Sequence, residues 1–216
     1  SEAATAASER DRLQQLHLIT TALQQTAALE GRLSVIARGL RSVGWEQAAV
    51  LLYGPDMQII HRAFAGIPVE AEPAFVESLL PGEVWSHRFD DPLLAAARVG
   101  SSYFFPADHP WLQEKAAVIG GSRQGAAPAH NGSASAWHEG DQFYLLMYAG
   151  MDVIGLINLR RPASGLRPTE AGIRPLELFV QQASSAVQNA RLNQESSQRQ
   201  RELSLLFEAS RLASSS

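Results

Sequence analysis

The stretch MDVIGLINLRRPASGLRPTEAGIRPLELFVQQASSAVQNARL, residues 151–192, carries the pattern that decides the fold. It opens on a long apolar run that ends near Arg161 and is typical of a central strand. After a turn-rich link, Thr169 suits the N-cap of a helix, because its hydroxyl can accept hydrogen bonds from the first backbone N–H groups. Pro175 lies inside that helix and removes one backbone hydrogen bond. We therefore expect a separate turn or a kink, with the regular helix beginning near Arg174.

Strand patterns elsewhere in the chain form two hairpins. The four segments are WEQAAVLLY (45–53) and MQIIHRAFA (57–65) around GPD, and DQFYLLMYA (141–149) and MDVIGLINLRR (151–161) around Gly150. Between the hairpins, residues 66–100 carry short helical segments, residues 101–106 a short strand, and residues 118–136 a Gly/Ala/Ser-rich loop. This order of elements predicts an α+β fold, with a central antiparallel sheet of five or six strands, helices on its faces and long helices at both termini.

Residues 8–42 have the periodicity of a helix with two apolar stripes. The first stripe repeats at alternating spacings of three and four, as in a coiled coil; it consists of Leu13, Leu16, Thr20, Leu23 and Ala27. The second stripe has a different phase and ends at Val43, so we expect a bend around residues 26–31. The first half of this segment is then predicted to face a partner, and the second half the core.

Composition excludes several classes of protein. The 216 residues are 45% hydrophobic and 19% charged, as in a globular protein with one sizeable domain. The net charge of −4 gives no basic surface, so neither nucleic acid nor a membrane is an expected partner. Without cysteine, the chain can form no disulfide, thiolate metal site or thioether-linked cofactor. No apolar run reaches the roughly 20 residues of a membrane span. We expect a soluble, cytoplasmic protein.

Catalytic and metal-binding patterns are weak. The best candidates for a metal site are three histidines near carboxylates in the sequence: His109, His130 and His138, with Asp108, Glu139 or Asp141. They span a long loop without a helical i,i+4 pair, so we expect no metal. The glycine-rich GGSRQG at 120–125 lacks the Lys-Ser/Thr ending of a phosphate-binding loop. A G-x-S-x-G motif is also missing, and we expect no catalytic residue.

The chain resembles a GAF domain, the sensory module of bacterial signalling proteins, most clearly over residues 155–192. GAF domains commonly close with a G-x-I/L-x strand, a turn containing a Pro-Thr pair, and a helix of type L-E-x-F-x-x-Q-x-A-x-A-x-x-N-A-R-L. The segments SYFFP (102–106) and WHEGD (137–141) are similar to segments of one GAF subtype. The resemblance spans residues 12–193 and implies a GAF/PAS-like fold and a signalling role.

The departures from the GAF pattern concern ligands. Many relatives carry an acidic VDDP after the last strand, where this chain has NLRRP. The bilin-attachment cysteine of phytochrome GAF domains is missing, as are the cysteines of the methionine-sulfoxide-reducing GAF enzymes and the N-K-x-F-D-E motif of the phosphodiesterase type. The resemblance therefore transfers no known ligand, and the cofactor is unknown.

Aromatic side chains are concentrated between the two hairpins, in the segment expected to cover one face of the sheet. Aromatic rings with a few polar groups are typical of small-ligand pockets. We therefore expect the ligand-binding residues to be Trp85, Phe89, Tyr103, Phe105, Trp137, His138 and Tyr144. The alternative is that these rings fill the core beneath this segment.

The resemblance implies three parts: a signalling or dimerisation helix over 1–28, a GAF-like sensor domain over 29–193, and a linker helix over 194–216 that leads to a downstream effector domain. We expect a non-catalytic sensory domain that binds a small molecule and relays its state through the terminal helices to a histidine kinase or nucleotide cyclase. The alternative is a pocketless module for dimerisation or signal transmission.

A homodimer through the terminal helices is expected from a second coiled-coil spacing, that of Leu176, Phe179, Ala183, Ala186 and Ala190, followed by the polar run 193–202. The alternative is that the N- and C-terminal helices of one chain pack side by side. The two ends of the chain are also alike, since Arg12, Leu16, Leu18, Thr21 and Leu23 align with Arg201, Leu205, Phe207, Ser210 and Leu212. Unless the likeness is due to chance, we expect the chain to be part of a longer sensor with repeated units.

Overall fold

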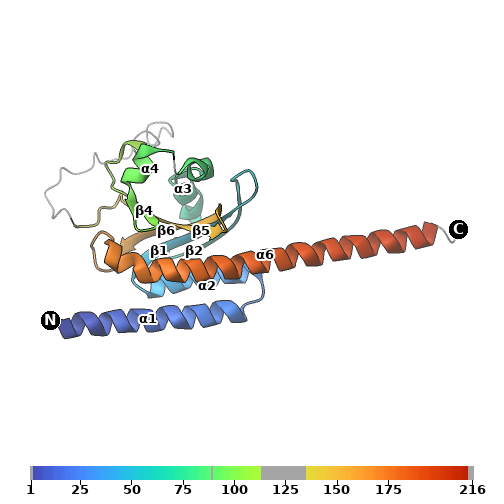
Figure 1. The fold of residues 1–216 in the computed structure, drawn as a ribbon, viewed down its shortest axis with the longest axis horizontal. Helices are drawn as coiled ribbons and strands as arrows, with labels where there is room; N and C mark the ends of the chain where they lie inside the picture. Colours follow the sequence, from blue (N-terminus) through green and yellow to red (C-terminus); the bar gives the residue numbers. More distant parts are fainter. Residues whose placement is uncertain (1, 89, 113–134, 214–216) are drawn as a thin grey trace.

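The computed structural model describes residues 2–88, 90–112 and 135–213 and has an α+β fold (Figure 1). Its elements are α1 (Glu2–Gln25), α2 (Leu29–Ser42), β1 (Trp45–Tyr53), β2 (Ile59–Ala65), η1 (Val69–Ala71), α3 (Glu72–Glu77), η2 (Gly82–His87), α4 (Pro92–Ala96), β3 (Arg98–Val99), β4 (Ser102–Phe105), β5 (Gln142–Ala149), β6 (Asp152–Pro162) and α6 (Glu170–Ala213). Both predicted hairpins and the two long terminal helices are confirmed. The predicted loop over residues 118–136 lies mostly outside the described residues.

The strands form one antiparallel sheet of six in the order β2-β1-β6-β5-β4-β3. The last hairpin lies at its centre, where Ile157 of β6 pairs with Val50 of β1 and with Leu145 of β5. Gly155 makes this close pairing possible, because a Cβ there would lie 2.5 Å from the carbonyl oxygen of Leu51. The two-residue strand β3 at the far edge was not predicted, since so short a segment has no readable period.

Each face of the sheet carries its own hydrophobic core, and α2 with α6 covers one of them (Figure 1). This core includes Leu33, Ile36 and Leu40 of α2, Leu176, Phe179 and Val187 of α6, and Val50, Leu145 and Ile157 of the sheet. The excursion, residues 66–112, covers the other face with α3, α4 and their connections. With both faces covered, the three central strands are apolar on both sides, which explains their near-continuous hydrophobic sequences.

The N-terminal helix breaks after Gln25, as predicted, and α1 lies along α2 and α6 of the same chain (Figure 1). Leu16 and Leu23 are buried in this contact, so the expectation that their stripe faces a partner is wrong for these two residues. The break at 26–28 lets α1 fold back. The hydroxyl of Thr20 donates to Oε1 of Gln182 on α6, at 3.3 Å.

The C-terminal helix α6 is a single element of 44 residues. Thr169 caps it as predicted, because its hydroxyl accepts from the backbone N–H of Gly172 at 3.3 Å. Helical structure begins at Glu170 and runs through Pro175, so the expected later start near Arg174 is wrong. The proline lies close enough to the helix start to cost one backbone hydrogen bond without ending the helix.

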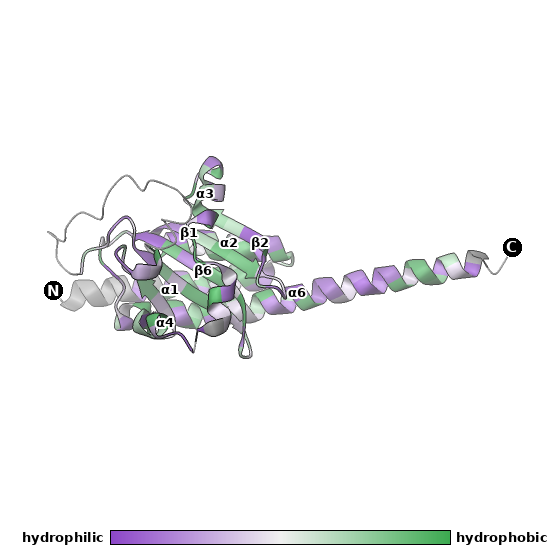
Figure 2. Ribbon diagram, turned by 90° about the horizontal axis from the view of Figure 1, so that it is seen from above, coloured by the Kyte–Doolittle hydropathy of each residue, from purple (hydrophilic) through white to green (hydrophobic). Residues whose placement is uncertain are grey.

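The packed and free halves of α6 differ in their surroundings. The stripe predicted for dimerisation is largely buried against the sheet, including Leu176, Phe179, Ala183 and Ala190, so it packs within one chain. From Leu192 to Arg211 the side chains are exposed, except for the half-buried Glu195, and the helix leaves the domain (Figure 1). This departing part is mostly hydrophilic, with a hydrophobic patch near its end (Figure 2). Within the described ranges, no helix has the length and apolar character needed to cross a bilayer.

The contact between α1 and α2 can be tested at Gly39, where a Cβ would lie 2.5 Å from Cγ2 of Ile19. We expect Gly39→Ala to lower the free energy of unfolding by about 1–2 kcal/mol, because overpacking outweighs the gain in helix propensity. In an Ile19→Ala background, the same change should raise it by about 1 kcal/mol, since the space is open. Denaturant unfolding of the four proteins measures both effects.

The control is Leu18→Ala, which removes an exposed neighbour on α1 and should leave the effect of Gly39→Ala unchanged. An equal effect of Gly39→Ala with and without Ile19 would contradict the packing of α1 on α2.

Candidate functional site

Four of the predicted site residues form one aromatic cluster between the sheet and the excursion. The ring centroid of Trp85 lies 5.2 Å from that of Tyr144 and 5.4 Å from that of Tyr103, and Phe105 lies 5.7 Å from Tyr144. All four side chains are buried. They come from η2, β4 and β5, and their side chains lie on the face of the sheet that the excursion covers. The cluster is filled with side chains, as the alternative interpretation of the aromatic residues requires.

The other predicted site residues lie elsewhere. Trp137 packs on the opposite face of the sheet, edge-on to Trp45 at 5.8 Å. Its backbone N–H donates to the carbonyl oxygen of Gly165, in the link between β6 and α6, at 2.9 Å. His138 is half-buried in the turn that precedes β5, where its backbone N–H bonds to Asp141. Phe89 lies outside the described residues.

Polar groups at one end of the aromatic cluster form hydrogen bonds with one another. The hydroxyl of Tyr144 donates to Oε1 of Gln142 at 3.1 Å and accepts from the backbone N–H of Leu80 at 3.3 Å. Tyr53, at the end of β1, belongs to the same core, and burial raises the pKa of its phenol. The indole Nε1 of Trp85 makes no well-formed hydrogen bond to a described group, although it lies close enough to Tyr53 to lower that pKa slightly.

Arg160 joins the end of α3 to the sheet through hydrogen bonds. Its Nη2 donates to Oγ of Ser78 at 2.7 Å and to Oε1 of Gln142 at 2.9 Å, and its Nε donates to Oδ1 of Asn158 at 3.0 Å. The guanidinium carbon lies 3.9 Å from the ring centroid of Phe75, which is a close cation–π contact. This partly buried network was not predicted. Its signal is the placing of polar residues at every second position of two otherwise apolar strands.

Arg160 and Arg161 are the residues by which NLRRP departs from the acidic GAF pattern. The first points into the network beneath α3, while the second pairs with Glu139 at the surface. The departure therefore places one half-buried positive charge between the sheet and the excursion.

A groove of about 700 Å³ opens beside the aromatic cluster, between the β1–β2 hairpin and the segment from α3 to η2. Its lining includes Leu51, Tyr53, Met57, Ile60, Arg62, Val76, Glu77, Leu79, Leu80 and Glu83. Tyr53 and Leu80 line the groove and also belong to the hydrophobic core that contains the aromatic cluster. The size falls within the range of small-molecule sites, and the lining combines an apolar floor with a few charged groups.

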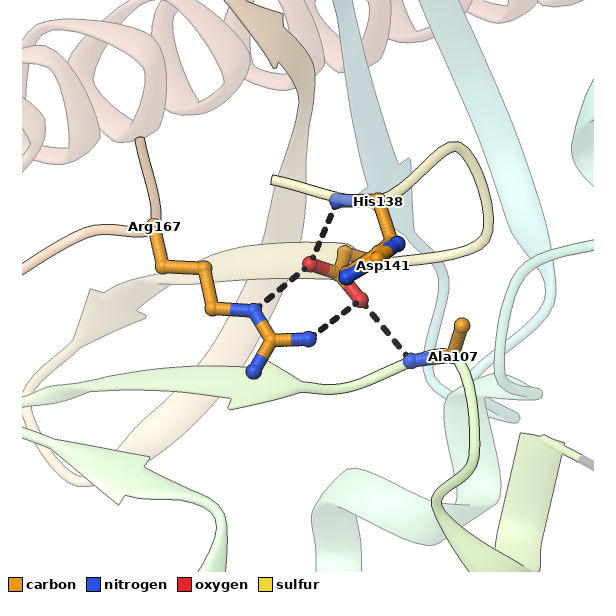
Figure 3. A network of polar contacts seen from close by, with 4 residues as sticks. All are labelled: Ala107, His138, Asp141 and Arg167. Carbon is orange, nitrogen blue, oxygen red and sulfur yellow. Dashed lines mark hydrogen bonds and ion pairs between the residues drawn. The ribbon is translucent and has the colours of Figure 1, made fainter. Parts of the chain in front are cut away.

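Asp141 has a structural role rather than a chemical one. Its buried carboxylate accepts from the backbone N–H groups of Ala107 and His138, both at 2.9 Å, and from Nε of Arg167 at 3.0 Å (Figure 3). These bonds join the end of β4, the turn before β5 and the link between β6 and α6. A carboxylate so fully engaged is poorly suited to metal binding or to acid–base catalysis.

The histidines considered for a metal site do not gather in the described part of the chain. The ring of His109 packs edge-on against Phe105 at 4.8 Å, and its Nδ1 accepts from the backbone N–H of Trp111. Burial lowers the pKa of His109. His130 lies outside the described residues, and within those described no three metal-ligating side chains come together.

Comparison with known proteins by sequence finds no matching family model and no matching curated protein. Solved structures match the fold. The GAF domain of a protein assigned as a sensor histidine kinase from Pseudomonas syringae pv. tomato is 15% identical, with a TM-score of 0.56 over 92% of this chain and 99% of that one. The GAF domain of an Acinetobacter phosphoenolpyruvate-protein phosphotransferase is 11% identical, with a TM-score of 0.54 over 85% and 97%.

A third match is the chromophore-binding domain of a bacteriophytochrome from R. palustris, which is 12% identical, with a TM-score of 0.54 over 86% of this chain and 64% of that one. The chain therefore has the fold of a GAF domain, as the resemblance over residues 155–192 implies. At these identities, the likeness extends to the fold alone.

The Asp141 network predicts a large loss of stability on Asp141→Asn. The change leaves Arg167 without its carboxylate partner and turns an amide N–H toward other donors, so we expect the free energy of unfolding to fall by about 3 kcal/mol. Glu139→Gln, two residues before Asp141 in the sequence, is the matched control. It removes the exposed partner of Arg161 and should lower the free energy of unfolding by less than about 1 kcal/mol. Denaturant unfolding compares the two, and equal losses would contradict the structural role of Asp141.

Proposed function

We propose that this chain is a non-catalytic sensory domain that binds a small molecule in the groove and relays its state through α6 to an effector. The observation that carries the proposal is the continuity of α6. Its first half packs on the sheet that floors the groove, and its second half leaves the domain without a break.

A continuous helix is suited to relay, because a displacement of its packed half moves the departing half as well. At 1.5 Å per residue, the departing part from Leu192 onward extends about 30 Å beyond the domain. Small rotations or shifts of packed helices are among the known ways in which proteins pass on a signal. Ligand binding and relay together would make the domain a sensor.

The groove suits a small organic ligand better than the aromatic cluster does. It is open, whereas the cluster beside it is closed by its own side chains. An apolar floor with Arg62, Glu77 and Glu83 at its margins would bind a molecule that has both an apolar part and polar ends. Some of the proteins that share the fold are named as a sensor kinase and a photoreceptor. We therefore propose a cytoplasmic bacterial signalling role, with an effector of the histidine kinase or nucleotide cyclase type.

The second candidate is a module for dimerisation or signal transmission that binds no ligand. The filled aromatic cluster favours it, because the space between sheet and excursion is occupied by side chains. Both candidates share the use of α6 as the output element.

We also propose that the chain forms a parallel homodimer through the outer face of α6. Four exposed leucines follow one coiled-coil stripe along the packed and departing halves: Leu178, Leu192, Leu203 and Leu206. In this register three of them occupy d positions, and the exposed Asn189 occupies an a position. The same register places Gln182 and Ser196 at a and Ser185 and Arg199 at d, so the apolar contacts of the pair lie at the four leucines. Leucine at d favours pairs of helices, and a polar residue such as Asn189 at a helps to fix their register. This stripe replaces the one predicted from the sequence, which is buried within the domain.

The ligand proposal can be tested by a thermal-shift screen of the chain against a library of small metabolites. A ligand at a hundred times its Kd stabilises the folded state by about 2.7 kcal/mol, which corresponds to a rise in Tm of about 5–10 °C. Val76→Arg should abolish the rise, because it places a long charged side chain in the half-buried wall of the groove and fills the space of the ligand. Val69→Arg is the control, since Val69 is 73% exposed outside the groove. If no compound raises the Tm, or if Val76→Arg leaves the rise intact, the ligand site is wrong.

The dimer proposal can be tested by sedimentation of variants at neighbouring leucines. Leu206, 67% exposed, lies on the stripe, whereas Leu205, 65% exposed, lies on another face of the helix. We expect Leu206→Glu to shift the protein from dimer to monomer, because it places like charges opposite each other in the seam. Leu205→Glu adds the same charge and should leave the dimer intact. A monomeric wild-type protein, or equal effects of both changes, would contradict the interface.

A further inference from the structure

Tyr53 lines the groove, belongs to the core that contains the aromatic cluster, and contacts α6. Its side chain is buried and lines the groove. Its backbone carbonyl accepts a hydrogen bond of 3.1 Å from Nη1 of Arg191 on α6. A single residue at the end of β1 therefore contacts both the proposed ligand site and the helix proposed to carry the signal.

Arg191 stands where α6 changes from packed to free. Ala190 is the last residue of the helix in the core, and Leu192 is already half exposed. Besides Tyr53, Arg191 bonds through Nε to Glu195 one turn further along, at 3.0 Å. The Arg191 side chain thus joins the sheet to the first turn of the departing helix.

The end of β1 is also constrained by contacts of the β1–β2 hairpin tip beside the groove. The β1–β2 pairing shifts register between Leu52 and Tyr53. Beyond this shift, the hairpin tip packs closely against the start of η2. A Cβ on Gly82 of η2 would lie 2.2 Å from the carbonyl oxygen of Met57 in the hairpin. Met57 has a positive φ of 56°, which is a strained conformation for a residue with a side chain. A molecule that parts the hairpin from η2 would therefore move the end of β1.

We propose that Tyr53 and Arg191 form a junction that couples occupancy of the groove to the direction of the departing part of α6. The inference rests on the proposed relay function. When the groove is filled, Tyr53 and the hairpin tip shift, the Tyr53 carbonyl changes position, and Arg191 and its turn of helix follow. Arg191 is a positioning residue in this scheme and does not contact the ligand.

The junction can be tested without knowing the ligand, because bulky side chains can fill the groove. Val76→Trp and Ile60→Trp fill it from its two walls, and Val69→Trp is the control outside it. The chain has no cysteine, so Met151→Cys and Ser204→Cys supply two unique sites for nitroxide spin labels. Both positions are exposed, one on the β5–β6 turn and one on the departing helix.

The distance between the two labels is measured by pulsed electron resonance in full-length protein diluted with unlabelled protein. Ser204 lies about 20 Å beyond Arg191 along the helix, so a tilt of about 10° moves it by about 3 Å. We expect Val76→Trp and Ile60→Trp to shift the mean distance by this order, and Val69→Trp to leave it unchanged. Using two filling variants guards against one that fails to fold.

The decisive comparison adds changes at Arg191. Arg191→Met keeps the apolar stem and removes the donors, and should abolish the shift caused by groove filling. Arg191→Lys keeps the charge and one donor, and should retain part of the shift. A shift of the same size with Arg191→Met would overturn the junction, as would the lack of any shift when the groove is filled and Arg191 is native.

These outcomes are separable from failure of the proposed function. A ligand found by thermal shift that moves the labels equally in the native and Arg191→Met chains would support sensing and overturn the junction. If no ligand is found but the filling variants shift the labels through Arg191, the junction holds and the ligand site is wrong.

Discussion

The fold depends on the requirement that both faces of the three central strands be covered. β1, β6 and β5 are apolar on both sides, so neither face can be left to water. The helices α2 and α6 cover one face, and the excursion between the two hairpins covers the other. Asp141 then joins the end of the excursion to the link before α6, which ties the two layers together at one edge. The position of α6 and the position of the groove are therefore set by the same sheet.

This arrangement places the candidate site at the border of the second core rather than within it. The centre is closed by Trp85, Phe105 and Tyr144, and the polar groups at its end are bonded to one another through Gln142. What stays open is the margin near Tyr53, where the groove lies between the β1–β2 hairpin and the segment from α3 to η2. A ligand at this margin would act on a strand end, which moves more easily than the middle of a sheet.

Much of the fold could be predicted from the sequence, because long apolar strands, hairpin turns and the Thr169 cap have local signals. The aromatic cluster could be predicted in part, since aromatic residues between the hairpins had to cover a face. Trp137 was assigned to the wrong face because its position depends on a contact with the distant link between β6 and α6, which no local pattern records. The Arg160 network, the groove and the Tyr53–Arg191 contact join residues far apart in the chain, so they could be found only in three dimensions. Leu16 and Leu23 of the first helix stripe, and most of the stripe from Leu176 to Ala190, contact the chain's own core, whereas Leu13 is exposed. Spacing alone does not distinguish a partner from the chain's own core.

The departing part of α6 has a thermodynamic consequence. A helix of this length that packs on nothing is only marginally stable in water, because its backbone hydrogen bonds barely offset the lost chain entropy. In the proposed dimer the second copy orders it, so its helical content depends on association. A change of about 1.4 kcal/mol at its base would alter the ratio of the two states tenfold. In the proposed relay, the signal would thus be graded as a population of ordered helix, which depends on protein concentration as well as on the state of the domain.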